Sequence, residues 1–129
     1  MAQKQRGVMI VSTFPNEQSA AQVAFGVVDA KLCACVNLAK IRSIYSWKGR
    51  LEDQKECLAL FKTTKKSVQK LKIEIARMHP YQVPEIIELA MGDVSRSYLE
   101  WMVAESSAQG VSKKRHNAAK RRNPQANVS

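Results

Sequence analysis

The spacing of apolar and polar positions predicts that the chain starts with a strand followed by a helix. Val8 to Phe14 is a short run of β-forming residues, and Pro15 and Asn16 end it. Asn16 is a good N-cap, so a helix can begin directly after it. Apolar residues then recur at helical spacing, at Ala20, Val23, Ala24, Val27 and Val28. We therefore expect the first helix to reach about Lys31.

A β-hairpin is predicted in the middle of the chain. Cys33 to Leu38 is an apolar run too short for a helix, and Ile41 to Trp47 is typical of a strand with two different faces. Lys48-Gly49 has the composition of a tight hairpin turn. Leu51 to Thr63 then returns as a long strand.

The remaining pattern predicts a second helix, a fourth strand and a last short helix. Thr64 can cap the second helix, which should end at His79 because the residue before a proline is pushed out of the α region. Ile86 to Met91 is the fourth strand region, and Asp93 or Ser95 can cap the last helix. The apolar stripes of the two helices are Val68, Leu71, Ile75 and Met78, and Tyr98, Trp101 and Met102.

This order of elements is the β-α-β-β-α-β arrangement of a ferredoxin-like α+β sandwich, with one helix added at the C-terminal end. An antiparallel sheet with helices on a single face leaves its other face bare. A chain of 129 residues is too short to cover that face itself, so we expect other subunits to cover it.

Composition and charge indicate one globular domain with a basic extension. The chain is 45% hydrophobic, which suits an ordinary folded domain, and its formal net charge is +10. Residues 105 to 129 hold six Lys or Arg and one acidic residue, and apolar periodicity is lost from Ser106 onward. We predict a folded domain over residues 1–105 and a disordered basic tail over residues 106–129.

Three features bear on the compartment. The first residues show no secretory signal, and no apolar stretch approaches the roughly 20 residues that cross a bilayer. Three cysteines, an odd number, argue against a disulfide framework. The simplest interpretation is a cytoplasmic protein without a membrane partner.

The segment from His79 to Glu85, His-Pro-Tyr-Gln-Val-Pro-Glu, concentrates chemistry on a rigid connector. Pro80 and Pro84 exclude a helix or a central strand, while a histidine, a tyrosine and a carboxylate lie close together in sequence. Such side chains on a fixed loop are typical of a binding site. The alternative is a structural corner in which His79 satisfies nearby backbone groups.

Several short motifs with their spacing resemble the CutA family over about residues 7 to 104. The matching pieces are Ala34-Cys35-Val36-Asn37, Ser43-Ile44-Tyr45-Ser46-Trp47, Glu56, Lys62-Thr63, the His79 to Glu85 connector and Tyr98-Leu99-Glu100-Trp101. The resemblance implies ferredoxin-like subunits in a tight homotrimer, similar in architecture to the trimeric PII-type signalling proteins. It also implies a role in tolerance of divalent metal ions, with copper bound by some members.

Aromatic and charged residues gather in these same motifs. Aromatic walls with a few charged groups suit a small-ligand pocket between subunits, although an interface core with satisfied polar groups has the same composition. The candidate ligand-binding residues are Trp47, Glu56, Lys62, Tyr81, Glu85 and Trp101. We expect the polar members to converge with His79 near Trp47 or Trp101, partly across a subunit boundary.

His79 is the candidate metal ligand, because neutral imidazole binds copper and other borderline divalent metals. The resemblance implies that metal-binding relatives can carry a cysteine and a second histidine where this chain has Ser12 and Met78. Cys33 and Cys35 have suitable sulfur atoms, but we favour two small core residues over metal ligands. No cofactor is required by this interpretation.

Sequence motifs for common catalytic sites are absent. The chain has no glycine-rich nucleotide loop, no P-loop and no nucleophile elbow, so we expect no enzymatic activity. The predicted function is a trimeric binder or sensor of metal ions or of a small ligand in inter-subunit clefts. The alternative is a trimeric scaffold whose tail binds nucleic acid or an acidic partner through Lys113–His116 and Lys120–Arg122. A solvated tail explains the same clusters without a partner.

Overall fold

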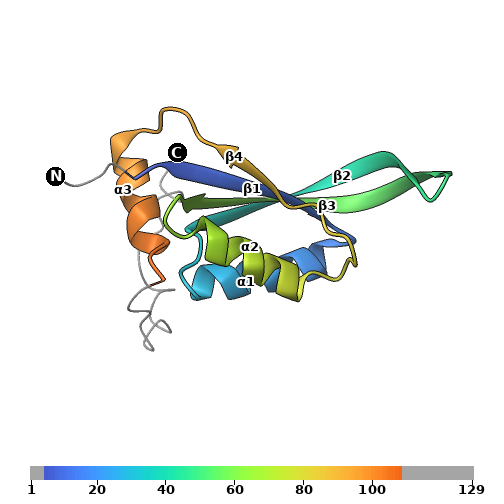
Figure 1. The fold of residues 1–129 in the computed structure, drawn as a ribbon, viewed down its shortest axis with the longest axis horizontal. Coiled ribbons are helices and arrows are strands. Elements are labelled where there is room, and N and C mark those ends of the chain that lie inside the picture. The colour runs from blue at the N-terminus through green and yellow to red at the C-terminus, as the bar shows by residue number, and fades with distance from the viewer. Residues whose placement is uncertain (1–4, 109–129) are drawn as a thin grey trace.

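A computed structural model describes residues 5–108, which form one antiparallel sheet and three helices (Figure 1). In chain order the elements are β1 (Gly7–Phe14), α1 (Glu17–Asp29), β2 (Cys35–Trp47), β3 (Arg50–Thr64), α2 (Val68–Met78), β4 (Ile87–Ala90) and α3 (Arg96–Glu105). The strand order in the sheet is β2-β3-β1-β4. The predicted ferredoxin-like α+β fold with an added C-terminal helix is confirmed.

The core lies between one face of the sheet and the helices α1 and α2, which run side by side along that face in Figure 1. The strands contribute Ile10, Phe14 and Phe61, all fully buried. The helices contribute Ala20, Val23, Val27, Val68, Leu71 and Ile75. The apolar stripes seen in the sequence are thus the buried faces of the helices, as amphipathic periodicity predicts.

The helix starts agree only in part with the sequence prediction. The Asn16 side chain accepts a hydrogen bond of 2.7 Å from the Ser19 amide, which confirms the cap of α1. The predicted cap at Thr64 is wrong: α2 begins at Val68, and Ser67 occupies its N-cap position. Pairing between β1 and β3 continues as far as Thr64, so this residue is the end of a strand.

The two apolar runs predicted before the hairpin turn form one long strand, β2. It pairs with β3 from Cys35–Lys62 to Trp47–Arg50, whereas β1 pairs only with residues 57 to 64 of β3. The outer part of the hairpin therefore projects beyond the rest of the sheet, at the right of Figure 1. Lys48 and Gly49 both have positive φ, 51° and 77°, which suits a tight hairpin turn.

The second face of the sheet is left largely open, because α1 and α2 share one side and α3 lies at the end opposite the hairpin (Figure 1). Strand pairing places apolar side chains on this open face, at Met9, Val11, Leu58, Leu60, Ile87 and Leu89. All six are half-buried or exposed. A single chain thus leaves an apolar sheet face in contact with water.

Hydrogen bonds of Ser106 join the end of α3 to the connection between β3 and α2. It is 1% exposed, its hydroxyl donates to the Met102 carbonyl at 2.6 Å, and its carbonyl accepts from the Ser67 hydroxyl. The folded part therefore extends past the predicted boundary at residue 105. Most of the predicted tail, with both basic clusters, lies outside the described residues. No helix among residues 5–108 is long and apolar enough to span a bilayer.

Candidate functional site

A cleft of about 650 Å³ opens where the connector after α2 meets the projecting hairpin. We call it the hairpin cleft. The residues that matter for its chemistry are Thr13 from β1, Ser43, Tyr45, Trp47 and Glu56 from the hairpin, and Tyr81 and Glu85 from the connector. Four of the predicted ligand-binding residues, Trp47, Glu56, Tyr81 and Glu85, are therefore brought together in one site.

One hydrogen bond joins the two sides of the hairpin cleft. The Tyr81 hydroxyl donates to the Glu56 carboxylate at 2.5 Å, across 25 residues of sequence. Burial, followed by the hydrogen bond to Glu56, raises the pKa of Tyr81, so the phenol stays protonated and remains a donor. The partner of the Glu56 carboxylate in this bond is therefore a neutral phenol and not a cation.

His79 lies behind the cleft rather than in it. Its Nδ1 accepts from the Tyr81 amide at 3.1 Å, so the proton is on Nε2, which lies 3.0 Å from the Thr13 carbonyl and 3.2 Å from the Ser12 hydroxyl. The imidazole also stacks on Phe14 with ring centroids 4.2 Å apart. His79 thus connects the connector to β1 and sets the position of Tyr81.

Burial determines the charge state of His79. The side chain is 9% exposed, and burial lowers the pKa of the imidazole below its ordinary value because the charged form loses hydration. The neutral tautomer with its proton on Nε2 fits both of its backbone partners. The structural role that the sequence left open for His79 is therefore the one that its contacts describe.

A metal centre at His79 does not fit the residues of a single chain. Both ring nitrogens are already engaged, and a metal would have to displace one of these hydrogen bonds. Within residues 5–108, no group of three His, Cys, Asp or Glu side chains is arranged to hold a metal. Cys33 is fully buried, and burial raises the pKa of its thiol, so it is a poor thiolate ligand.

Lys62 and Trp101 lie apart from the hairpin cleft. Six residues of extended strand separate Lys62 from Glu56, a span of about 20 Å. The Lys62 Nζ lies 5.8 Å from the centre of the Tyr98 ring, and Tyr98 packs against Trp101 with centroids 5.3 Å apart. Within one chain, the predicted convergence therefore does not include Lys62 or Trp101, which form a second group with Tyr98 at α3.

Sequence reasoning missed part of the lining of the hairpin cleft. Thr13 and Ser43 line it, and neither was a candidate. Tyr45 had a usable signal, because it lies two residues from Trp47 and alternation puts both on one face of β2. Thr13 had none, since its place in the site depends on how the connector returns to the end of β1.

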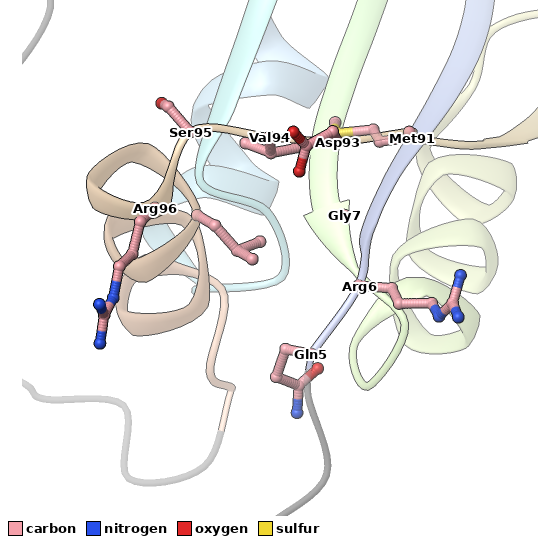
Figure 2. Close-up of a pocket in the computed structure, with 10 residues that line it drawn as sticks. Gln5, Arg6, Gly7, Met91, Asp93, Val94, Ser95 and Arg96 are labelled. Atoms are coloured by element: carbon pink, nitrogen blue, oxygen red, sulfur yellow. The ribbon is translucent and has the colours of Figure 1, made fainter.

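A second cavity, of about 1030 Å³, lies at the other end of the sheet between the start of β1 and the segment that leads into α3. Figure 2 shows Arg6 and Arg96 extending away from each other, with Asp93 on a different part of the wall. These charged groups do not converge on one point. The hairpin cleft, where polar and aromatic groups face a common space, is therefore the candidate site.

Comparison with known proteins agrees with this fold. Residues 8–105 match the family model for the CutA1 divalent ion tolerance protein. The divalent-cation tolerance protein CutA of Thermotoga maritima is 38% identical over 95 residues, 74% of this chain and 94% of that protein. A crystal structure of CutA1 from Pyrococcus horikoshii matches with a TM-score of 0.75 at 36% identity, covering 78% of this chain and 98% of that one.

A third match comes from Archaeoglobus fulgidus, whose CutA is described as a periplasmic divalent cation tolerance protein. Its structure gives a TM-score of 0.76 at 27% identity over 78% of this chain and 99% of that chain. The fold and these matches define a divalent-cation tolerance protein of the ferredoxin-like class. The chain belongs to the CutA1 family.

Proposed function

We propose that this protein is a homotrimeric, non-enzymatic sensor or carrier that binds a small ligand in the hairpin cleft. The observation that carries the proposal is the hydrogen bond between Tyr81 and Glu56, which holds the connector against the hairpin. It gives the cleft a fixed shape before any ligand arrives, and preorganisation of this kind lowers the cost of binding.

The trimer part of the proposal is supported by the surface of a single chain. The open face of the sheet carries apolar side chains such as Leu89, which is 49% exposed, and the hairpin exposes Trp47 and Leu51. Contiguous apolar surface of this kind is typical of interfaces. Other copies that cover the open face would also bring their surfaces toward the cleft, because the hairpin that forms one side of the cleft projects from the body of the chain.

We favour a small organic ligand over a copper ion at His79. The imidazole holds the connector through two hydrogen bonds, and metal binding there would disrupt them. The tolerance of divalent cations that names the relatives is then an indirect consequence of ligand binding in this chain. A titration with copper(II) chloride separates the two ideas: His79→Ala should leave copper affinity unchanged, whereas a tenfold loss would restore His79 as a ligand.

We further propose that the protein has no catalytic role and is found in the cytoplasm. The family name describes tolerance, not a reaction, and the ring nitrogens of His79 are turned toward backbone groups rather than into the cleft. Cys33, Cys35 and Cys57 form no disulfide within residues 5–108, which suits a reducing compartment. Cell fractionation tests the location, since the Archaeoglobus relative is described as periplasmic.

The ligand proposal is tested by a screen of small metabolites and fragments against the full chain. Trp101→Phe leaves Trp47 as the sole tryptophan, so its fluorescence reports on the cleft. Saturable changes that Tyr81→Phe weakens would support the proposal, with Tyr98→Phe in α3 as the matched control. A screen with no response at Trp47 would contradict it. Nucleic-acid binding by the tail stays a prediction, because the basic clusters lie outside the described residues.

A further inference from the structure

We infer that the hairpin cleft selects organic ammonium ions, that is, amines carried on an apolar or aromatic body. This inference rests on the proposed function and specifies the chemical class of its ligand. The sequence pattern and the family name do not indicate it. It follows from the charges and rings that the fold brings to one place.

The charge of the cleft is opposite to that of the chain. The chain carries a formal net charge of +10, yet the residues that line the cleft include two carboxylates, Glu56 and Glu85, and no Lys, Arg or His. Glu56 accepts its hydrogen bond from a neutral phenol, so no cation of the chain pairs with this carboxylate in that bond. An anionic ligand would meet two like charges in this cleft, whereas an ammonium group would be attracted by both.

The walls of the cleft suit a cation with an apolar body. Tyr45, Trp47 and Tyr81 line it, and the faces of such rings attract ammonium groups. The chain itself provides an example, because the Lys48 ammonium lies 5.8 Å from the centre of the Trp47 ring. An external ammonium ion would compete with Lys48 for this ring and would gain the two carboxylates as well.

A bare metal cation fits the same cleft less well. Hard divalent cations require several oxygen ligands at short distance, and no group of three acidic, His or Cys side chains comes together anywhere in residues 5–108. A metal ion would also leave the three aromatic walls without a partner. A cleft of about 650 Å³ is large enough for a small organic molecule, which can use both the carboxylates and the rings.

The test compares three probes of equal size and different charge on the full chain carrying Trp101→Phe. Benzylamine is a cation at about pH 7, benzyl alcohol is neutral and benzoate is an anion. We expect benzylamine to change Trp47 fluorescence saturably with about tenfold higher affinity than benzyl alcohol, and benzoate to bind most weakly. Glu85→Gln should lower the affinity for benzylamine about tenfold and leave the affinity for benzyl alcohol unchanged.

Two further variants separate local from general effects of charge. Glu100→Gln removes the same charge from α3, away from the cleft, and should leave benzylamine affinity within about twofold of the parent. Lys48→Gln removes the competing ammonium and should strengthen benzylamine binding. Sedimentation and circular dichroism that match the parent show that each variant is folded.

The outcomes distinguish this inference from the proposed function. Equal affinity for the amine and the alcohol, or tighter binding of benzoate, would overturn selection of cations and leave a small-ligand cleft standing. Loss of benzylamine binding in Glu100→Gln as large as in Glu85→Gln would also overturn it. If none of the three probes binds at millimolar concentration, the cation class is wrong, and the proposed function falls only if the wider fragment screen is blank too.

Discussion

Tyr81 and Glu56 form a 2.5 Å hydrogen bond that ties the proline-rich connector to the hairpin. Tyr81 also donates its backbone amide to His79, so one residue links the cleft to the histidine behind it. Because His79 in turn reaches the Thr13 carbonyl, the position of Tyr81 is fixed from two sides. The connector is therefore part of a rigid site, not only a corner between α2 and β4.

Removing the hydroxyl of Tyr81 should destabilise the protein. Tyr81→Phe leaves the Glu56 carboxylate without its donor, and we expect the free energy of unfolding to fall by about 1–2 kcal/mol. Urea denaturation measures the change. Tyr45→Phe is the matched control, since its ring lines the same cleft and its hydroxyl takes no part in the bond to Glu56. Equal losses in both variants would show that the Tyr81–Glu56 bond has no special role.

Stability should depend on the protonation of His79. Its pKa is lower in the folded protein than in the unfolded chain, so the unfolded state takes up more protons as the pH falls. The contribution is fully present above about pH 6.5 and is lost as the pH falls below that value. Carboxylates such as Glu88, whose pKa is lowered by Lys72, lose their contribution only in more acidic solution. Unfolding free energies between about pH 7 and pH 5.5 therefore isolate the histidine.

His79→Gln is the control for this pH dependence. Glutamine cannot take up a proton in this range, so the variant should be less stable than the parent at pH 7 and its stability should change less between pH 7 and pH 5.5. Parallel pH curves for the variant and the parent would show that another group is responsible. The second histidine, His116, is present in both proteins and cancels in the comparison.

Truncation should reveal a sharp boundary at Ser106. A chain ending at Ala108 keeps the buried hydroxyl and carbonyl of Ser106, and its melting temperature should match that of the full chain. A chain ending at Glu105 leaves the Ser67 and Thr64 hydroxyls without their partner, and should lose about 1–3 kcal/mol of unfolding free energy. Equal stability of the two truncated chains would contradict the role of Ser106. Comparing the full chain with the chain that ends at Ala108 also tests whether residues 109–129 bind nucleic acid.

The trimer prediction can be tested by placing a charge on the open face of the sheet. Leu89→Glu changes a side chain that is 49% exposed in a single chain, so its effect on an isolated subunit should be small. If copies of the chain cover this face, the charge should shift sedimentation equilibrium from trimer toward monomer. Ile73→Glu, on the exposed side of α2, is the control and should leave the mass unchanged. A parent protein that is monomeric at micromolar concentration would refute the assembly outright.

The sequence predicted the elements better than the site, for physical reasons. Periodicity identified the faces of β3, because alternation separates Glu56 and Lys62 from Phe61 regardless of the rest of the fold. The rise of an extended strand already separates Lys62 from Glu56 by about 20 Å, and the expected convergence depended on other elements and other subunits, whose positions periodicity does not give. Thr64 has the composition of a helix cap, but it pairs with Gly7 as the last residue of β3. This pairing joins distant parts of the chain, so local sequence could not indicate it.

The central claim is that the hairpin cleft is the ligand site, and the two tryptophans allow a direct test. A nitrogen–proton correlation spectrum of the full chain shows the indole N–H of Trp47 in the cleft and of Trp101 in α3. We predict that titration with benzylamine moves the Trp47 signal saturably and leaves the Trp101 signal in place. Movement of the Trp101 signal alone would contradict the account. Movement of neither signal would overturn the ammonium class, and it would contradict the cleft as the ligand site if the wider fragment screen is blank as well.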